Sequence, residues 1–354
     1  LSNLFTHPPA HLTFAAGDQK TQDVNGDHNM TDKKFNVLVS DRSIHPSGID
    51  LLRPVAELTF LEGYAAPEVF AAAVSETDAI FCRSGIVDAS VIDAAPKLKI
   101  VSRHGVGYDN VDIDACTRRG IVVTTTGEAN SQSVSELAIG MMLYLGRFIR
   151  RANADMDAGL WERTSLLGTE LFQKTLGIVG LGRVGTRLAK HANGFDMEVL
   201  VCDPNLDADT VVKHGAKQVD LQTLLAQSDY VSLHLPLSPE TRHIIGAEEL
   251  SQMKESAILI NCARGGIVDE DALYTALVEK QIAGAGIDVF EKEPLPAGHP
   301  LIGLDNVCHS PHIAGQTAES LVRVSLQTAE NILTVLRGEK LDPGFVVNPE
   351  ALAD

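Results

Sequence analysis

The sequence predicts an α/β protein with two doubly wound parallel-sheet domains. Three observations support this prediction: a length of 354 residues, short β-branched runs that alternate with helical patterns, and a long helical stretch at 133–159 that divides the alternation into two series. Two domains are the natural expectation at this length, because a single core seldom serves more than ~250–300 residues. Strands that alternate with helices indicate parallel sheets covered by helices.

The first series of strands begins at Phe35. Its strand-like runs are FNVLVS, DAIFCRS, LKIVSRH and IVVTTT, and the helical segments between them are PEVFAAAV, DASVIDAA and NVDIDACTRRG. Residues 1–34 are polar and lack periodicity, so we expect a disordered extension there. Met30 stands just before the first strand, and we take it as a candidate start of natural translation.

The second and longer series begins near residue 175. Its strand-like runs are TLGIVGL, MEVLVCDP, DYVSLHLP, AILINCAR, GAGIDVF and NVCHSPH, with helical stretches such as GRVGTRLAKHANG and EDALYTALVEKQ between them. Residues 133–159 suit one long helix that links the two series. Apolar residues at helical spacing from Leu321 to Leu336 predict a last helix that ends at Gly338 and returns to the first domain.

Composition excludes several classes of partner. A net charge of −18 opposes binding to nucleic acids and to acidic membrane surfaces, so neither is expected as a partner. The longest apolar run, ELAIGMMLYLG, is too short to cross a bilayer. The five cysteines are scattered singly, which indicates free thiols in a reducing compartment and a cytoplasmic location.

The strongest local signal is TLGIVGLGRVG, in which a strand runs into Gly180, Gly182 and Gly185 at GxGxxG spacing and then into a helical pattern. Such glycines let the backbone approach a pyrophosphate, whose charge the helix N-terminus favours. Asp203 ends the next strand, 18 residues after Gly185. It would accept hydrogen bonds from ribose hydroxyls and repel a 2′-phosphate, so NAD is predicted rather than NADP. The alternative is that Asp203 is only a turn residue.

Three polar residues follow later strands: Arg264 in NCARGGIVD, Glu293 in FEKEP and His312 in SPHIAG. Together they suit hydride chemistry on a 2-oxo acid. We predict His312 as the acid/base, Glu293 as the carboxylate that orients it, and Arg264 as the substrate anchor. Each could instead be an ordinary surface or core residue, and spacing alone does not show that they converge. His309 is expected to be structural, and no metal site is predicted, because no third ligand lies nearby.

Several segments resemble the signature segments of the D-2-hydroxyacid dehydrogenases: GIVGLGRVG, LHLPLSPETRHIIG, INCARGGIVDEDAL, GAGIDVFEKEP and SPHIAGQT. Within that family, WERTSLLGTELFQKTLGIVGLGRVG and RHGVGYDNVD most resemble the D-3-phosphoglycerate dehydrogenase branch. The resemblance covers residues 36–340 and implies two lobes with the active site in the cleft between them. A flavodoxin-like substrate domain would comprise 35–130 and 313–348, and a Rossmann NAD domain would comprise 131–312.

The resemblance also implies particular contacts. Arg83 and Arg103 would hold a substrate phosphate. The carboxylate would be bound by backbone amides of a loop formed by His104, Gly105, Val106 and Gly107. The further cofactor contacts that it implies are Arg183, Val184, His234, Pro236, Thr241, Cys262, Ala263, Asp288, His312 and Gly315. The bulky His104 and apolar Val106 depart from the branch, which usually has a small residue and a hydroxyl there, and this leaves the substrate open.

The activity implied is NAD-dependent hydride transfer on a D-2-hydroxy acid or 2-oxo acid, with 3-phosphoglycerate as the first candidate. A hydroxypyruvate or glyoxylate reductase would use the same three residues on a smaller acid. A different class with the same fold is an NAD-sensing binding protein like the C-terminal-binding corepressors. The resemblance further implies a homodimer formed through 133–159 and the GLWERTSLLG segment that follows.

Overall fold

The computed structural model describes residues 34–352 and contains two parallel sheets. The five-stranded sheet has the order β2-β1-β3-β4-β5 and the seven-stranded sheet the order β12-β11-β10-β9-β6-β7-β8. The predicted fold class is therefore confirmed. The disorder predicted for 1–34 and the Met30 hypothesis fall, apart from Lys34, outside the described residues. No helix within residues 34–352 is long and apolar enough to cross a lipid bilayer.

The strands are short and, within each sheet, every neighbouring pair is parallel. The first sheet contains β1 (Phe35–Val39), β2 (Ala56–Phe60), β3 (Ala79–Cys82), β4 (Ile100–Arg103) and β5 (Val122–Thr124). The second contains β6 (Thr175–Val179), β7 (Glu198–Cys202), β8 (Lys217–Gln218), β9 (Tyr230–Leu233), β10 (Ile258–Asn261), β11 (Gly284–Ile287) and β12 (Val307–His309). Because parallel strands end at the same edge, the residues that follow them gather there.

Helices connect the strands, and many begin at a side-chain cap. Asp88, Asp112 and Asp269 each accept backbone N–H bonds at the start of a helix, as aspartate does at N-caps. The helices between strands of the first sheet are α1 (Pro46–Leu52), α2 (Pro67–Ala73), α3 (Ala89–Asp93) and α4 (Ile113–Arg118). Those of the second series are α7 (Arg183–Gly194), α8 (Ala208–Val212), α9 (Leu221–Gln227), α10 (Ala247–Gln252) and α11 (Glu270–Val278).

The prediction of a single long helix at 133–159 is wrong, because the structure has two helices there. They are α5 (Ser131–Gly146) and α6 (Ile149–Asp157). The carbonyl of Gly146 accepts a hydrogen bond from Thr169 N at 2.8 Å instead of continuing the helical ladder. Phe148 then takes a left-handed conformation with φ of 53°. The break therefore depends on a contact with a segment more than twenty residues away.

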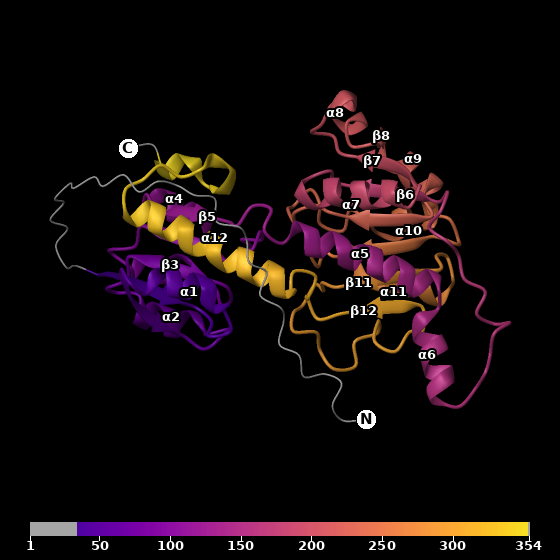
Figure 1. The fold of residues 1–354 in the computed structure, drawn as a ribbon, viewed down its shortest axis with the longest axis horizontal. Helices are drawn as coiled ribbons and strands as arrows, with labels where there is room; N and C mark the ends of the chain where they lie inside the picture. The colour runs from indigo at the N-terminus through magenta and orange to yellow at the C-terminus, as the bar shows by residue number, and fades with distance from the viewer. Residues whose placement is uncertain (1–33, 353–354) are drawn as a thin grey trace, which may run out of the picture. The chain divides into compact units, whose positions relative to one another are not determined.

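The last helix, α12 (Ala318–Leu336), confirms the predicted helix, and Gly338 follows it with φ of 69°. It packs against the first sheet rather than the second, and its neighbours there are α1, β3 and β4 (Figure 1). Gly48 N in α1 donates to Ser325 Oγ at 3.1 Å. Ile332 and Leu333 share a core with Val37 and other residues of the first sheet. Two short 3-10 turns, Pro343–Phe345 and Pro349–Leu352, follow.

Candidate active site

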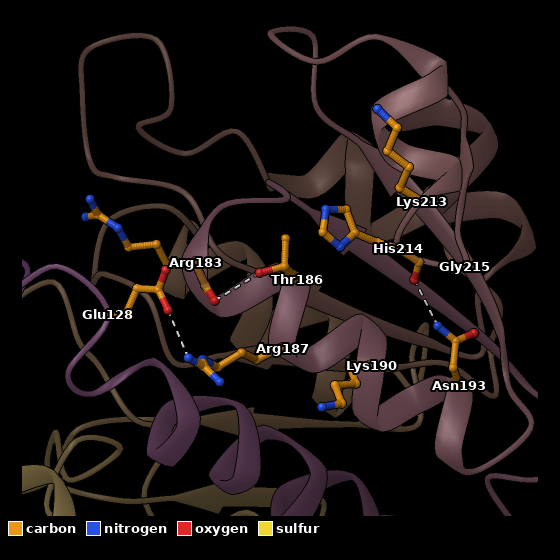
Figure 2. A pocket seen from close by; sticks show the side chains of 9 residues that line it. All are labelled: Glu128, Arg183, Thr186, Arg187, Lys190, Asn193, Lys213, His214 and Gly215. Carbon is orange, nitrogen blue, oxygen red and sulfur yellow. Dashed lines mark hydrogen bonds and ion pairs between the residues drawn. The ribbon is translucent and has the colours of Figure 1, made fainter. Parts of the chain in front are cut away.

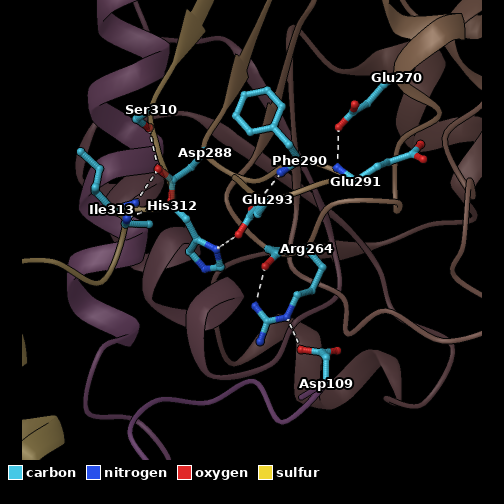
Figure 3. A network of polar contacts seen from close by, with 12 residues as sticks. Asp109, Arg264, Glu270, Asp288, Phe290, Glu291, Glu293, Ser310, His312 and Ile313 are labelled. Atoms are coloured by element: carbon cyan, nitrogen blue, oxygen red, sulfur yellow. Dashed lines mark hydrogen bonds and ion pairs between the residues drawn. The ribbon is translucent and has the colours of Figure 1, made fainter. Parts of the chain in front are cut away.

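His312 and Glu293 form a hydrogen-bonded pair beyond the carboxyl ends of the seven-stranded sheet (Figure 3). His312 Nδ1 lies 2.8 Å from Glu293 Oε2. The other carboxylate oxygen accepts a bond from Phe290 N at 3.0 Å. The His312 side chain is 50% exposed, and Nδ1 is engaged, so Nε2 is the nitrogen left for proton exchange with a bound molecule.

A buried carboxylate holds the turn that carries His312. Asp288 is fully buried and accepts bonds from Ser310 Oγ at 2.6 Å, Ile313 N at 2.9 Å and Ala314 N at 2.8 Å. His312 N donates to the carbonyl of Asp288 at 2.8 Å. These bonds keep His312 at a φ of 55°, a conformation that histidine adopts only where the surroundings enforce it.

Arg264, which follows β10, makes contact with the loop that follows β4. Its Nε donates to Asp109 Oδ2 at 2.8 Å, and its Nη1 donates to the carbonyl of Ala263 at 2.6 Å. The guanidinium occupies the space that a side chain at Gly107 would need. Asp109 was not singled out from the sequence, although it lies in the YDNVD stretch directly after residues 104–107.

The pKa of Glu293 is influenced by both of the other predicted residues, His312 and Arg264. Burial by itself would raise the pKa of Glu293, but four influences outweigh it: the hydrogen bond and charge of His312, the Phe290 N–H and the charge of Arg264. They hold the pKa of Glu293 below its ordinary value, so the carboxylate is ionised at neutral pH. The structure therefore brings Arg264, Glu293 and His312 into one site.

The glycine loop connects β6 to α7, as the sequence predicts. Gly180 has a φ of 92°, and a side chain at Gly185 would collide with the carbonyl of Gly180. Leu181 N donates to Asp203 Oδ2 at 2.9 Å, and Asn205 N donates to Oδ1 at 3.0 Å. The two carboxylate oxygens of Asp203 thus hold the glycine loop and the turn after β7. The backbone amides at the N-terminus of α7 are not among its donors, so they can bind a pyrophosphate.

Comparison with known proteins decides the family. Residues 139–314 match the model for the NAD binding domain of D-isomer specific 2-hydroxyacid dehydrogenases. The chain is 41% identical over 321 residues to glyoxylate reductase of Thermofilum pendens, an alignment that covers 88% of this chain and 94% of that protein. This chain belongs to the D-isomer specific 2-hydroxyacid dehydrogenases. The family resemblance and the NAD-binding domain predicted from the sequence are thereby confirmed.

Two further members of this dehydrogenase family place the chain among its relatives. D-3-phosphoglycerate dehydrogenase of Methanocaldococcus jannaschii is 42% identical over 305 residues, or 86% of this chain, but the chain spans only 58% of that protein. The crystal structure of D-lactate dehydrogenase from Aquifex aeolicus, complexed with NAD and lactic acid, has a TM-score of 0.80 and 30% identity. It covers 88% of this chain, and this chain covers 99% of it.

The remaining cofactor contacts implied by the family stay predictions, and the structure gives each residue a place. His234 Nε2 lies 2.9 Å from Ser232 Oγ, and burial lowers the pKa of His234 to about 4, so this imidazole is neutral. Thr241 Oγ1 donates to the carbonyl of Pro236 at 2.7 Å. Arg183 Nη2 donates to the carbonyl of Gly344 at 2.8 Å. Of the others, Val184 lies in the first turn of α7, Cys262 and Asp288 are buried, and Ala263 and Gly315 are partly exposed.

Arg83 and Arg103, the predicted phosphate-binding arginines, differ in what they already bind. Arg103 donates through Nε to the carbonyl of Gly107 at 2.7 Å, and through Nη1 to the carbonyls of Cys82 at 2.8 Å and Arg83 at 2.6 Å. These bonds favour a positioning role for Arg103 in holding the loop at 104–107, which we call the substrate loop. Arg83 Nη1 donates to Ser43 Oγ at 2.7 Å and to its carbonyl at 3.0 Å.

Two surface cavities lie apart from the His312 site. Figure 2 shows one of about 540 Å³ along α7, where Arg187 Nη2 pairs with Glu128 Oε2 at 2.9 Å and Lys190 and Lys213 also line the wall. The other, of about 810 Å³, is lined by residues such as Arg323 and Phe345. Since neither is lined by Arg264, Glu293 or His312, the candidate site rests on side-chain geometry and not on cavity volume.

We expect Glu293→Gln to lower kcat by roughly 10²-fold or more, because an amide cannot stabilise an imidazolium as a carboxylate does. The lowered pKa of Glu293 fixes the pH range of the effect. The carboxylate is ionised above that pKa and loses its charge only as pH falls through it. The variant should therefore be impaired across the whole neutral and mildly acid range. A pH–rate profile that matches wild type near pH 7 would contradict this.

We expect Asp203→Ala to raise the Michaelis constant for NADH by about tenfold and to increase the relative use of NADPH. The carboxylate is an acceptor for ribose hydroxyls and repels a 2′-phosphate, and it also braces Leu181 N. Asp203→Asn keeps an acceptor without the charge and serves as the matched control. Steady-state kinetics with both cofactors measure the effect, and an unchanged NADPH-to-NADH ratio in both variants would refute it.

Proposed function

We propose that the chain is an NAD-dependent oxidoreductase that transfers hydride between NAD(H) and a D-2-hydroxy acid or its 2-oxo acid. The observation that carries the proposal is the His312–Glu293 pair beside Arg264. A general base must take the hydroxyl proton as hydride leaves carbon 2, and a histidine oriented by a carboxylate suits that step. Bound NAD would supply the hydride acceptor, held at the glycine loop and Asp203.

In the proposed mechanism each residue has one task. His312 Nε2 takes the proton of the C2 hydroxyl, and in the reverse direction returns it to the carbonyl oxygen. Glu293 holds Nδ1–H and stabilises the imidazolium that forms. Arg264 binds the carboxylate and polarises the carbonyl. Within the loop at 104–107 the amides of His104 and Gly105 already donate to the carbonyls of Cys82 and Arg103, so the amides of Val106 and Gly107 complete the carboxylate site. In this proposal 35–130 with 313–348 binds the substrate and 131–312 binds NAD.

Two substrates are supported by different observations. The phosphoglycerate branch is favoured by the 42% identity to a D-3-phosphoglycerate dehydrogenase and by Arg83, a partly exposed cation near the substrate loop. Glyoxylate or hydroxypyruvate is favoured by an alignment that spans 94% of a glyoxylate reductase. We place 3-phosphoglycerate and its 2-oxo product first, and the smaller acids second.

A substrate screen tests the proposal. Oxidation of NADH would be followed with 3-phosphohydroxypyruvate, hydroxypyruvate, glyoxylate, pyruvate and sulfopyruvate. Saturable turnover with at least one of these acids is expected. Inactivity with all of them, together with measurable NADH binding, would overturn the proposal and favour a corepressor-like NAD sensor.

A homodimer in the cytoplasm is the assembly and location that we propose. Support for the dimer comes from apolar side chains on α6 and the segment after it, since Met156 is 56% exposed, Trp161 75% and Leu167 88%. Water-exposed apolar groups gathered in one segment are typical of an interface. A sedimentation mass of one chain at micromolar concentration would contradict the dimer. The unpaired cysteines are consistent with a reducing cytoplasm.

A further inference from the structure

His104 is a buried histidine whose side chain has no task in the mechanism above. It follows β4 directly and is only 8% exposed. Its ring lies beside that of Phe81, with centroids 5.8 Å apart. Its backbone N–H donates to the carbonyl of Cys82 at 2.8 Å, and the chain then turns at Gly105, which has a φ of 140°. The backbone of His104 is thus fixed at the start of the substrate loop, and its ring packs beside Phe81.

The ring nitrogen Nε2 of His104 is buried and, among the residues that the structure describes, has no hydrogen-bond partner. Buried polar atoms are nearly always paired, so an unpaired one indicates a missing partner. Burial and the charges of Arg83 and Arg103 lower the pKa of His104 to about 3. The imidazole is therefore neutral near pH 7 and carries one N–H, and in the tautomer with the proton on Nε2 it presents a donor there.

Of the two neighbouring arginines, Arg83 is the cation with capacity for a ligand. Arg103 is bonded to three backbone carbonyls of its surroundings, whereas the bonds of Arg83 run through one nitrogen to one residue, Ser43. The nearby Asp41 carboxylate is already engaged by Ser43 and Ser84, so its charge is partly satisfied. An oxygen atom brought between Arg83 and His104 would meet a cation and a neutral donor.

The substrate loop connects the region of His104 and Arg83 to the catalytic residues. Gly107 lies against the guanidinium of Arg264, while the ring of His104, three residues earlier, lies beside Phe81 and is influenced by the charge of Arg83. A small acid whose carboxylate meets Arg264 and the loop amides would extend its third carbon toward the His104 end. Because Nε2 is shielded from solvent, the ring or the side chains around it must move before a substrate reaches it. Within residues 34–352, the guanidinium of Arg83 is bonded only to Ser43.

We propose that the His104 side chain determines specificity by donating Nε2–H to an oxygen on carbon 3 of the substrate, beside Arg83. This inference rests on the proposed function and names its substrate class. The class is 2-oxo acids that carry a hydroxyl or phosphate oxygen on carbon 3, preferred over glyoxylate and pyruvate, which carry none. A site built around a donor disfavours an analogue without the matching oxygen, because the donor then stays unpaired.

The test compares kcat/KM for hydroxypyruvate and 3-phosphohydroxypyruvate with that for pyruvate and glyoxylate. We expect His104→Ala to lower the ratio of oxygen-bearing to plain substrates by roughly 10- to 100-fold, mainly through KM. His104→Gln keeps most of the volume and a donor, so it should restore part of the ratio and covers the case in which the alanine variant is unstable. The two oxygen-bearing substrates separate recognition of a hydroxyl from that of a phosphate. His309→Ala, an exposed histidine, is the control and should change no ratio.

Other outcomes would overturn the inference in recognisable ways. An equal loss of kcat/KM with all four substrates in both His104 variants would assign the residue to core packing, although the proposed function would stand. A wild-type preference for glyoxylate or pyruvate would contradict the substrate class. Inactivity of the wild type with every acid would remove the proposed function itself, and the inference with it.

Discussion

Replacing His312 with alanine is expected to lower kcat by about 10²–10⁴-fold, with little change in NADH affinity. The proposed proton acceptor disappears, while the glycine loop and Asp203 are untouched. The carboxylate of Glu293 would also lose the partner 2.8 Å away. Single-turnover absorbance of NADH and a fluorescence titration with NADH separate the two quantities.

Two controls guard against a merely structural effect at His312. His312→Asn keeps a residue that tolerates the left-handed conformation at φ of 55° and should be as inactive as the alanine variant. His309→Ala removes an exposed histidine three positions away and should retain wild-type turnover. Near-normal kcat in His312→Asn would remove the acid/base assignment.

The substitution Gly107→Ala is expected to lower kcat/KM by roughly 10- to 100-fold, although Gly107 has no side chain that could take part in the reaction. The methyl would take the place of the Arg264 guanidinium and would break its bond to Asp109. The substrate anchor would be displaced, so most of the loss should appear in KM. Steady-state kinetics with the best substrate of the screen measure it.

A double-mutant cycle shows whether Gly107 acts through Arg264. If it does, Gly107→Ala combined with Arg264→Ala should be no worse than Arg264→Ala alone. Additive losses would mean that Gly107 acts independently of the arginine. Gly194→Ala, at the end of α7, is the matched control, because a side chain there meets nothing within 4 Å. It should leave kinetics unchanged.

The sequence predicted much of the fold because its strands are short, apolar and separated by clear helical patterns. Two strands were not predicted, because their sequences carry only a weak strand pattern. The strand at Ala56–Phe60 alternates exposed and buried residues, and Lys217–Gln218 is only two residues long, so neither was recognised. The helix break after Gly146 depends on Thr169, a contact that no local pattern records.

The residues of the candidate site could be predicted from the sequence, but their arrangement in space could not. The positions of Arg264, Glu293 and His312 after strands suggested that they gather at one edge. Their convergence required the sheet order, which the sequence did not supply. Asp109 escaped notice because its role depends on Arg264, a residue 155 positions away. Likewise, only the fold revealed that the Asp288 carboxylate holds the turn that carries His312.

The return of α12 to the first sheet has a consequence for synthesis on the ribosome. The five-stranded sheet is complete once Thr124 has been made, yet the helix that covers α1 and β4 comes some two hundred residues later. Until then Val37 and its core neighbours lack Ile332 and Leu333. The seven-stranded sheet, made entirely from intervening residues, can close while the chain is still growing. The five-stranded sheet is thus made before the seven-stranded sheet but completes its core after it.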